Sequence, residues 1–305
     1  MPEQQPSPGG SEARVTTVVM TRDRWPDLCE SLAHHEGPVV VVDNGSHDGT
    51  PGLVRRHFPH VTLVALDHNL GAVARNLGVE LARTPYVAFA DDDSWWAPGA
   101  LEVAADVFDE HPRLALLAAQ LRVGEREEPD PVCALMADSP LGHEPDLPGP
   151  SVLGFLACGA VVRRSAFLQA GGFDDVVFFM GEEERLALDL ATSGWGLAYV
   201  DRVQAHHHPS PARDPRARRV RAARNRLLTT VLRRPWPVVL AEVRADLRGG
   251  RTGRAALLRA LPLLPRALAR RRRLPAEVEA ARRLLEEDAP VSPRPAGAAR
   301  GGPPS

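Results

Sequence analysis

The sequence predicts an α/β protein, in which a mostly parallel β-sheet is flanked by helices and a basic α-helical C-terminal extension follows. Two patterns favour the sheet. Short apolar runs alternate with helical stretches along the first half of the chain, as in βαβ units with right-handed crossovers. Polar clusters follow several of these runs directly, at the strand ends where open parallel sheets hold their ligands. The extension is predicted by the many arginines after residue 202.

The first half of the chain is expected to alternate strands and helices. Brief apolar runs rich in strand-forming residues suit buried strands, and they predict strands at 15–20, 38–42, 61–66 and 87–89. Helices are expected between these strands, at 25–32, after residue 50 and at 72–82. The first of these helices has Pro26 near its start, a position that proline favours. These elements together predict a parallel sheet.

The second half of the chain is less regular. The stretch 125–150 is rich in proline and acidic residues, and we expect it to be a long surface loop. The other α/β elements expected are a helix at 98–110, a strand at 114–120, a strand at 155–162, a helix at 163–171, a loop at 172–175, a helix at 182–193 and a strand at 195–200. Basic helices are expected afterwards at 216–232, 238–247, 254–273 and 275–288, with Pro262 and Pro265 interrupting the third.

These elements divide the chain into four segments. We expect a disordered N-terminus at 1–13, an α/β catalytic domain at 14–212, a basic helical region at 213–288 and a disordered tail at 289–305. The composition, with 44% hydrophobic and 25% charged residues, is that of a soluble globular protein.

Several features bear on where the protein works. No apolar run reaches the roughly 18 residues of a transmembrane helix. The polar N-terminal residues lack the basic and apolar regions of a signal peptide. The three cysteines, Cys29, Cys133 and Cys158, are widely spaced and odd in number, which indicates a reducing compartment. The sequence therefore predicts a cytoplasmic protein.

The net charge of −2 conceals an uneven distribution. Residues 202–273 contain 20 arginines and 3 acidic residues, while the rest of the chain has a net charge of −19. Such a basic region can meet phosphates, anionic lipid or an acidic partner, and no nucleic-acid partner is expected. Its apolar helix faces either rest on anionic membrane, at the inner face of the plasma membrane, or pack on the catalytic domain or a second subunit. Packing is favoured, because apolar helix faces are most often core.

Three consecutive carboxylates, Asp91, Asp92 and Asp93, follow the predicted strand at 87–89. Adjacent carboxylates repel one another and stay ionised at modest cost only in water or beside cations. An isolated triplet is most often a solvated acidic turn. The alternative is a site for Mn²⁺ or Mg²⁺, which take oxygen and imidazole ligands and often bridge a carboxylate to substrate phosphates. Polar clusters after other strands, at 21–23, 43–44 and 206–208, favour a single polar cleft.

Two further triplets leave two interpretations open. The histidines at 206–208 are either the polar exit of a strand or a contact to metal or phosphate. Glu182, Glu183 and Glu184 open a predicted helix, where acidic side chains interact favourably with the helix dipole. One of the first two is alternatively a general base, because the apolar residues before them can partly desolvate a carboxyl group and raise its pKa.

Several common nucleotide and nucleophile motifs are absent. The sequence contains neither Gly-x-Gly-x-x-Gly nor Gly-x-x-x-x-Gly-Lys-[Ser/Thr], which disfavours the dinucleotide fingerprint and the P-loop. It also lacks a Gly-x-Ser-x-Gly nucleophile elbow. No Cys/His spacing of a structural zinc site is present. Any nucleotide must therefore be held in another way.

The order of the clusters resembles that of family 2 glycosyltransferases, which have the GT-A (Rossmann-like) fold. The resemblance extends over about residues 14–210. Its motifs in chain order are Val-Met-Thr-Arg-Asp-Arg at 19–24, Val-Val-Asp-Asn-Gly-Ser-His-Asp-Gly-Thr at 41–50, Asn-Leu-Gly-Ala-Val-Ala-Arg-Asn-Leu-Gly at 69–78, Phe-Ala-Asp-Asp-Asp at 89–93, Gly-Gly-Phe-Asp at 171–174 and Gly-Glu-Glu at 181–183, followed by the histidines. Each motif is weak alone, but six in order are strong evidence.

The resemblance implies a nucleotide-sugar site. The residues that would bind the nucleotide-sugar are Thr21, Arg22, Asp23, Arg24, Asp43, Asn44, Arg75, Asn76, Asp91 and Asp92. Among these, Asp43 would accept a hydrogen bond from the imide N–H of the base, and Arg75 would lie near the base or the diphosphate. Asp93 would be the main ligand of Mn²⁺ or Mg²⁺, and His207 is the histidine expected to complete the metal shell.

The resemblance also implies an acceptor side. Gly172, Phe173 and Asp174 would border the acceptor pocket. The family usually carries Glu-Asp as its base motif, where this chain has Glu182-Glu183. Because the longer side chain can still reach the acceptor, Glu183 is expected to be the base, with Glu182 as the alternative. The chain also departs from the family by having Arg185 where an Asp is frequent, and Arg224-Asn225 matches a pair found in part of the family.

The sequence thus predicts a metal-dependent, inverting glycosyltransferase. It would move a sugar from a UDP-, dTDP- or GDP-sugar to an acceptor hydroxyl. The acceptor would be a glycan, a lipid-linked molecule or a small molecule, and the product a cell-envelope glycan, a glycolipid or a secondary metabolite. A metal would neutralise the leaving diphosphate, and a carboxylate would deprotonate the attacking hydroxyl. One alternative is a nucleotidyltransferase, which the lack of an early Gly-rich, Lys-containing loop disfavours. The other is a catalytically inactive binding protein that keeps the fold.

Overall fold

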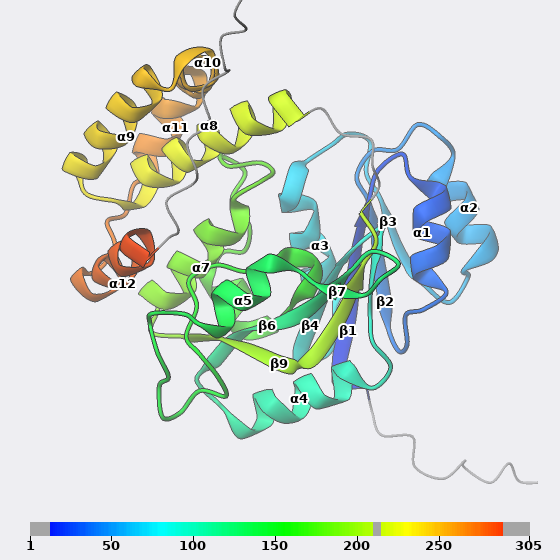
Figure 1. The fold of residues 1–305 in the computed structure, drawn as a ribbon. Coiled ribbons are helices and arrows are strands. Elements are labelled where there is room, and N and C mark those ends of the chain that lie inside the picture. Colours follow the sequence, from blue (N-terminus) through cyan, green and yellow to red (C-terminus); the bar gives the residue numbers. More distant parts are fainter. Residues whose placement is uncertain (1–12, 210–214, 289–305) are drawn as a thin grey trace, which may run out of the picture.

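The strands form a single nine-stranded sheet within residues 13–209 and 215–288, which the computed structural model describes (Figure 1). Eight strands follow the order β3-β2-β1-β4-β8-β6-β9-β5, and β7 pairs with β6. Their bounds are β1 Val15–Thr21, β2 Val39–Asp43, β3 Thr62–Ala65, β4 Tyr86–Asp91, β5 Ser94–Trp96, β6 Leu114–Val123, β7 Glu128–Pro129, β8 Ala160–Arg163 and β9 Gly196–His207.

The sheet is mostly parallel, as predicted. β3, β2, β1 and β4 pair in parallel, and so do β6 and β9. β8 lies antiparallel between β4 and β6, so that these two strands still run in the same direction. β5 pairs antiparallel with β9 at the edge of the sheet. The carboxyl ends of β1, β2 and β4 therefore meet at one edge.

One set of helices flanks the sheet, and a second set gathers beside it (Figure 1). Those of the α/β part are α1 Trp25–Leu32, α2 Thr50–His57, α3 Ala74–Leu81, α4 Ala100–Glu110, α5 Pro131–Ala137, α6 Arg164–Ala170 and α7 Glu182–Thr192. Those of the C-terminal group are α8 Pro215–Arg233, α9 Trp236–Arg248, α10 Gly250–Ala260, α11 Leu264–Ala269 and α12 Ala276–Asp288. Short 3₁₀ turns at Gly71–Val73, Ala157–Gly159 and Leu261–Leu263 complete the list.

The sheet is covered on both faces, which explains its uninterrupted apolar strands. Successive residues of β1 point to opposite faces. Val19 packs in one cluster with Leu28 of α1 and Val54 of α2. Val18 belongs to the main core cluster on the other face, where α3 packs so closely that a Cβ on Gly78 would lie 2.4 Å from Val18 Cγ1. The buried strands thereby hold the loops at their carboxyl ends in fixed positions.

The C-terminal helices pack on the α/β part through one apolar face. Leu228 of α8, Val239 of α9 and Ala267 of α11 share a cluster with Val176 and Val177, which precede α7. The favoured packing of these helices is confirmed for this face. The helix expected at 254–273 is broken into α10, a 3₁₀ turn and α11 at its two prolines, as predicted.

Three local predictions differ from the structure in their bounds or content. The expected loop at 125–150 contains β7 and α5, because Asp130 caps α5 by accepting a hydrogen bond from the Val132 N–H at 2.8 Å. The strand expected at 155–162 is β8, which begins only after a 3₁₀ turn. The strand expected at 195–200 extends to His207, since β9 resumes its pairing with β6 after a register shift beyond Val200. β5, its partner, was not expected.

Some predictions lie outside the described residues. These are the disorder expected at 1–13, of which only residue 13 is described, the disorder expected at 289–305, and the domain boundary expected between residues 212 and 213. Among the helices that the structure does describe, none combines the length and the apolar composition needed to cross a bilayer.

Candidate functional site

A cavity of about 440 Å³ lies at the carboxyl ends of β1, β2 and β4, and we call it the strand-end cavity. Its wall is formed by four segments: strand ends, the turn at 69–71, the loop at 178–180 and the start of α8. The residues that line it are Met20, Thr21, Arg22, Arg24, Asn44, Asn69, Gly71, Asp91, Asp92, Phe178, Phe179, Met180, Ala217, Arg218 and Arg221. Six of the predicted nucleotide-sugar residues are therefore brought together here.

Asp91, the last residue of β4, and the two aspartates that follow it are each paired. Asp92 accepts a hydrogen bond from Thr21 Oγ1 at 3.1 Å and lies 3.1 Å from Arg24 Nε. Asp93 Oδ2 lies 3.3 Å from the same guanidinium, and Asp91 pairs with Arg75. Burial raises the pKa of Asp92 to about 7 despite Arg24, and the neighbouring Asp91 and Asp93 add to this rise. The triplet is thus a partly desolvated polar centre and not a solvated turn.

Arg75 connects the triplet to the glutamates of α7. Its side chain is buried, and its two nitrogens reach Asp91 and, at 3.7 Å, Glu182 Oε1. Burial alone would lower the pKa of this guanidinium, but Asp91, Glu182 and Glu183 raise it above its ordinary value. Arg75 is therefore a buried bridge between the two predicted carboxylate groups, and it does not line the strand-end cavity.

The two candidate bases differ in their surroundings. Glu182 is 1% exposed and has its pKa raised to about 8, first by burial and then by Glu183, while Arg75 opposes the rise. Glu183 is partly exposed, accepts a hydrogen bond from the Gly181 N–H at 3.2 Å, and has its pKa raised by burial. A raised pKa suits a carboxylate that must accept a proton. Glu182 is engaged by a buried cation, whereas Glu183 is the more accessible of the two.

The three histidines separate into two groups. His207 Nε2 lies 3.5 Å from Asp93 Oδ1, because Ser94 of β5 pairs with His207 of β9. His206 and His208 turn instead to Glu127, with nitrogen–oxygen distances of 2.6 and 3.3 Å. Alternation along the strand explains the split. The structure thus brings together the predicted metal ligands Asp93 and His207.

The donor set fits a divalent cation. A carboxylate oxygen and an imidazole nitrogen are suitable ligands for Mn²⁺ or Mg²⁺. Asp93 is 4% exposed, so that its charge benefits from a nearby cation. No group of three or more potential metal-ligating side chains is found in the described ranges. An ion held here would take its remaining ligands from water or substrate.

Other predicted nucleotide-binding residues shape the turns around the cavity. Asp43 accepts the Ser46 N–H at 2.9 Å, and Asp23, which has a positive φ of 53°, accepts the His47 N–H at 2.6 Å. Asn44 donates to the carbonyl of Gly71 at 3.0 Å and accepts the Leu70 N–H at 2.7 Å. Of these three, only Asn44 lines the strand-end cavity.

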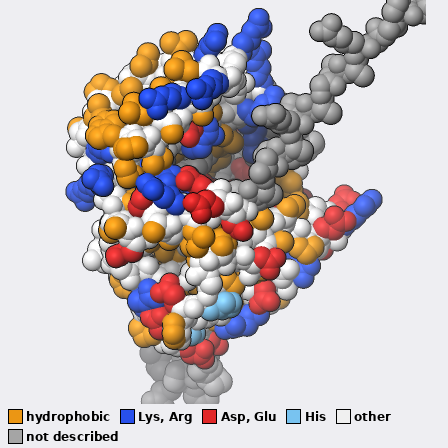
Figure 2. All heavy atoms as spheres, turned by 60° about the vertical axis from the view of Figure 1, so that its left-hand side comes forward, with side chains coloured by type: hydrophobic (Ala, Val, Ile, Leu, Met, Phe, Trp, Pro, Cys, Tyr) orange, Lys and Arg blue, Asp and Glu red, His pale blue; other side chains and the backbone are white. Residues whose placement is uncertain are grey.

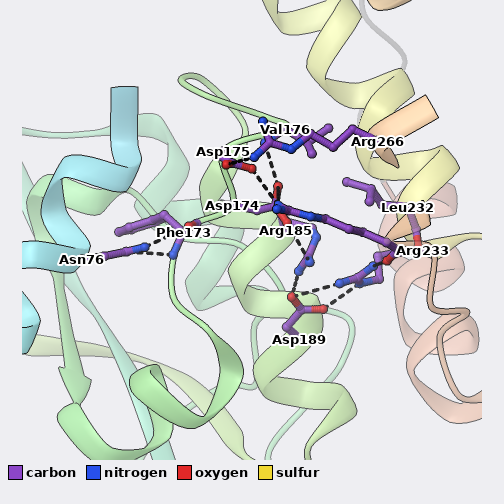
Figure 3. A network of polar contacts seen from close by, with 11 residues as sticks. Asn76, Phe173, Asp174, Asp175, Val176, Arg185, Asp189, Leu232, Arg233 and Arg266 are labelled. Atoms are coloured by element: carbon purple, nitrogen blue, oxygen red, sulfur yellow. Dashed lines mark hydrogen bonds and ion pairs between the residues drawn. The ribbon is translucent and has the colours of Figure 1, made fainter. Parts of the chain in front are cut away.

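Asn76 holds the segment predicted to border the acceptor (Figure 3). Its amide donates to the Phe173 carbonyl and accepts the Phe173 N–H, both at 3.0 Å. A Cβ on Gly172, whose φ is +66°, would lie 2.7 Å from Asn76 Oδ1. The Phe173 ring is buried against Phe89. Asn76 and Gly172 therefore position this loop, and neither lines the strand-end cavity.

Asp174 faces away from the strand-end cavity toward α7 and the C-terminal helices (Figure 3). Its carboxylate accepts the Val176 N–H at 2.7 Å and lies 3.4 Å from Arg185 Nη2. Arg185, the residue found where the family often has Asp, also pairs with Asp189. The departure from the family pattern thus gives Asp174 a cationic partner.

Sequence reasoning missed part of the cavity wall. Arg218 and Arg221 line the strand-end cavity from α8, and Phe178 to Met180 line it from a loop. The three-residue spacing of the two arginines was visible in the sequence, since such residues share a helix face. Which face of this basic helix meets the cavity was not.

The predicted Arg224-Asn225 pair acts on the same loop. Asn225, which is 1% exposed, donates to the carbonyls of Phe179 and Met180 at 2.6 Å each. Arg224 donates to the Asn225 amide oxygen at 2.8 Å. On the other side of the loop, the Phe178 carbonyl accepts the Ala72 N–H at 2.6 Å. The pair thus holds a wall of the strand-end cavity in place.

Comparisons with known proteins agree with this arrangement. The family model described as "Glycosyl transferase family 2" matches residues 18–170. The N-acetylglucosaminyl-diphospho-decaprenol L-rhamnosyltransferase of Mycobacterium tuberculosis is 31% identical over 242 residues, which cover 66% of this chain and 78% of the relative. The pre-mycofactocin glycosyltransferase of the same organism is 32% identical over 225 residues, which cover 70% of this chain and 47% of the relative.

Solved structures share the fold. A mannosyltransferase from Pyrobaculum calidifontis, in complex with GDP-Man and Mn²⁺, has a TM-score of 0.57 at 24% identity, covering 90% of this chain and 86% of that one. TarS 1–349 of S. aureus in complex with UDP-GlcNAc has a TM-score of 0.55 at 17% identity, covering 88% and 84%. These likenesses establish the GT-A fold. Since the family model spans the strand-end motifs on which the cavity is built, we conclude that this chain is an enzyme of glycosyltransferase family 2.

Proposed function

We propose that this glycosyltransferase is metal-dependent and inverting, and that it transfers a sugar from a nucleotide-diphosphate sugar to a hydroxyl of a lipid-linked cell-envelope acceptor. One observation carries the proposal: Asp93 and His207 lie 3.5 Å apart beside the strand-end cavity, and two arginines of α8 line that cavity. A cation site and fixed cations are what a sugar diphosphate needs, because its leaving group is a dianion or trianion.

The strand-end cavity is proposed to hold the donor. Arg218 and Arg221 offer guanidinium groups suited to the diphosphate, because guanidinium forms paired hydrogen bonds with phosphate oxygens. Thr21, Arg22 and Asn44 would contact the base and ribose. Asp43 remains the proposed partner of the base N–H: its Oδ2 is buried and has no hydrogen-bond donor within the described ranges.

The metal is proposed to be Mn²⁺ or Mg²⁺, held by Asp93 and His207. When bound, it would act as a Lewis acid on the leaving diphosphate. The mannosyltransferase from P. calidifontis was solved with Mn²⁺, which supports a divalent ion. In the described structure, Arg24 contacts both Asp92 and Asp93. Arg24 would therefore turn toward the phosphates when the ion takes its place beside Asp93.

Glu183 is proposed as the general base. It would accept the proton of the acceptor hydroxyl as the oxygen attacks the anomeric carbon. A single displacement of this kind inverts the anomeric centre. Glu182, through Arg75, would hold Asp91 at the donor side. The accessible position and raised pKa of Glu183 support this division of roles.

The acceptor is inferred from the relatives. One is named for rhamnosyl transfer to N-acetylglucosaminyl-diphospho-decaprenol, which supports a lipid-linked diphosphate acceptor for this chain. Such an acceptor would require the protein to work at the cytoplasmic face of a membrane. The C-terminal helices α9 to α11 expose large apolar side chains among arginines, and Figure 2 shows hydrophobic and basic side chains gathered on the upper part of the molecule. The exposed ones are Trp236, Leu240, Leu247, Leu258, Leu261 and Leu268.

Vesicle sedimentation tests the membrane contact. The full chain should sediment with vesicles of phosphatidylglycerol and phosphatidylcholine, and less with phosphatidylcholine alone, because basic amphipathic helices favour anionic lipid. The double variant Leu258→Gln and Leu261→Gln should lose most of the binding. Equal sedimentation with both lipids, or no effect of the variant, would contradict the proposed contact.

A donor screen tests the reaction. Thermal unfolding of the chain is first measured with Mn²⁺ and each of the UDP-, dTDP- and GDP-sugars. Release of the nucleoside diphosphate is then measured for any donor that stabilises the protein. The right donor should raise the unfolding free energy by about 2.7 kcal/mol at a hundredfold excess over Kd. Release should require the metal. If no donor yields metal-dependent release, with or without lipid-linked acceptors, the proposed function is wrong.

A further inference from the structure

A second cavity of about 440 Å³ lies between α6 and α7 on one side and α8 and α11 on the other. We call it the arginine cavity, because five arginines and only two aspartates line it. Arg185 of α7 and Arg233 of α8 belong to its wall, and Arg270 and Arg272 follow α11. Its wall includes Asp174, which begins the loop whose Phe178 to Met180 line the strand-end cavity.

Two of these guanidinium groups are buried and crowded (Figure 3). Arg185 is 6% exposed, and its Nε has no hydrogen-bond acceptor among the residues described. Burial, and then the nearby Arg233, lower its pKa to about 9. Burial also lowers the pKa of Arg233 to about 10. Buried guanidinium groups with lowered pKa values are stabilised by a nearby anion.

The aspartates of the cavity do not balance this charge. Asp189 is shared, since it pairs with Arg185 and lies 2.7 Å from Arg233 Nε. Asp174 lies 3.4 Å from Arg185 and 3.8 Å from Arg270. Arg271 turns away to the Arg234 carbonyl and the Trp236 ring.

The remaining four arginines therefore face two carboxylates of the cavity wall. Arg270 also pairs with Asp175 outside the wall, but Arg266 pairs with the same carboxylate, so this outer pair leaves the excess of positive charge unchanged. The exposed Arg272 makes no side-chain hydrogen bond or ion pair among the described residues. The imbalance amounts to two positive charges, which is the charge of one phosphoryl group with the opposite sign. Guanidinium groups are also the side chains best shaped to pair with phosphate oxygens.

The arginine cavity includes two of the three residues that the family resemblance places beside the acceptor. Gly172 and Asp174, both predicted to border the acceptor, form part of its wall. Arg185 stands on α7 less than one turn after Glu183, the proposed base. The two side chains leave different faces of α7, because residues two positions apart on a helix do not face each other, so a ligand held by Arg185 would share the helix of the proposed base and not its face.

We propose that the arginine cavity binds a phosphoryl or diphosphoryl group of the acceptor, and so selects acceptors that carry phosphate near the reacting sugar. This inference rests on the proposed function. A purely structural role, in which the arginines only tie α7 to the C-terminal helices, predicts no affinity for phosphate. Free phosphate is the other source of the same chemistry, and the experiment separates the two.

The first measurement is calorimetric titration of the full chain with inorganic pyrophosphate. The test variant is Arg270→Gln with Arg272→Gln, and Arg272→Gln alone guards against misfolding, because this side chain is exposed and without a partner among the described residues. Arg273→Gln is the matched control for Arg272→Gln, since each removes one charge and Arg273 lies one residue outside the cavity wall. The dissociation constant should rise about tenfold or more in the double variant and stay near the wild-type value in the control. Equal values in the double variant and the control would overturn the site.

The second measurement identifies the source of the phosphate. Farnesyl diphosphate and farnesol serve as probes of a lipid-linked group. Farnesyl diphosphate should bind at least as tightly as pyrophosphate, with the same dependence on Arg270 and Arg272, and farnesol should bind much more weakly. If pyrophosphate binds and farnesyl diphosphate does not, the assignment to an acceptor is wrong.

The two proposals fail separately. Metal-dependent donor hydrolysis by the wild-type chain needs no acceptor, so its absence with every donor would count against the proposed function. The titrations would still decide whether the arginine cavity binds phosphate.

Discussion

The strand-end cavity and the arginine cavity have similar volumes but are assembled in different ways. Nearly half of the residues that line the first lie at or just after the ends of β1, β2 and β4, so neighbours in the sequence remain neighbours in that part of the site. The second has no strand-end residues and combines faces of α6, α7 and α8 with the chain after α11. A strand end presents consecutive side chains to one place, whereas a helix face selects every third or fourth residue. The comparison explains why one cavity can be recognised in the sequence and the other cannot.

The largest effect should come from the metal side of the strand-end cavity. Asp93→Ala should lower Mn²⁺-dependent release of nucleoside diphosphate about a hundredfold or more, because it removes the buried carboxylate proposed to hold the ion. The assay follows diphosphate release at saturating donor. Asp201→Ala, which removes an exposed carboxylate of β9, is the control and should keep the wild-type rate. A rate for Asp93→Ala near that of the control would sink the metal assignment.

The next effect concerns Glu182 and Glu183, the two glutamates that begin α7. Glu183→Gln should lower the rate of transfer to the acceptor by about 10²–10⁴-fold and leave donor affinity unchanged, because the amide cannot accept the proton. Glu182→Gln should weaken donor binding through Arg75 and reduce transfer less. Single-turnover transfer and donor titration measure the two quantities. A greater loss of transfer in Glu182→Gln would exchange the two roles.

The α8 wall of the strand-end cavity should show an intermediate effect. Arg218→Gln should raise the KM for the donor about tenfold at unchanged kcat, since a charge-assisted hydrogen bond to the diphosphate is lost. Arg219→Gln is the matched control: it is the next residue on the same helix, exposed, and absent from the cavity wall. Similar KM values for the two variants would mean that α8 acts only through its overall charge.

The smallest effect is a pH dependence of stability. Glu182 has its pKa raised to about 8 in the folded protein, so the folded state holds a proton that the unfolded state releases. Its contribution to stability is present in full below the ordinary pKa of glutamate, near 4.5, and is lost as pH rises through 8. The unfolding free energy should therefore fall with pH, by at most about 1.4 kcal/mol per unit for this proton.

Denaturant unfolding at pH 6, 7 and 8 measures this decline. Glu182→Gln cannot release the proton, so its unfolding free energy should change less over the same interval. If the variant and the wild type decline in parallel, Glu182 is not the group responsible.

The sheet and the strand-end residues were predictable because each depends on local sequence. Apolar runs in the sequence predict β1, β2 and β4. Thr21, Asn44 and Asp91 lie at or just after the ends of these strands, so their positions could be predicted too. The pairing of His207 with Asp93 was proposed from the family resemblance, and the geometry behind it depends on β5, which was not expected. A three-residue strand in polar surroundings carries too little periodicity to be recognised.

The C-terminal contribution to the site was not predictable for a different reason. Arg218 and Arg221 are two among many arginines of the basic region, and only tertiary packing of α8 decides which of them meet the cavity. The same holds for Asn225. The sequence showed only that it belongs to a pair found in part of the family, whereas the structure shows that its amide holds the backbone of Phe179 and Met180.

The loop before α7 has a consequence for how specificity can be exchanged among related enzymes. Asp174 at one end of this loop lines the arginine cavity, and Phe178 to Met180 at the other line the strand-end cavity. Asn225 of α8 holds the loop by a hydrogen bond to the Phe179 carbonyl. Gly71, from the N-terminal half of the chain, packs so closely on Phe178 that a Cβ at Gly71 would lie 2.3 Å from the Phe178 carbonyl oxygen. Transferring the loop without α8, or α8 without the loop, would separate Asn225 from the two loop carbonyls that it binds. The smallest interchangeable unit of this enzyme is therefore the loop, α7 and α8 together.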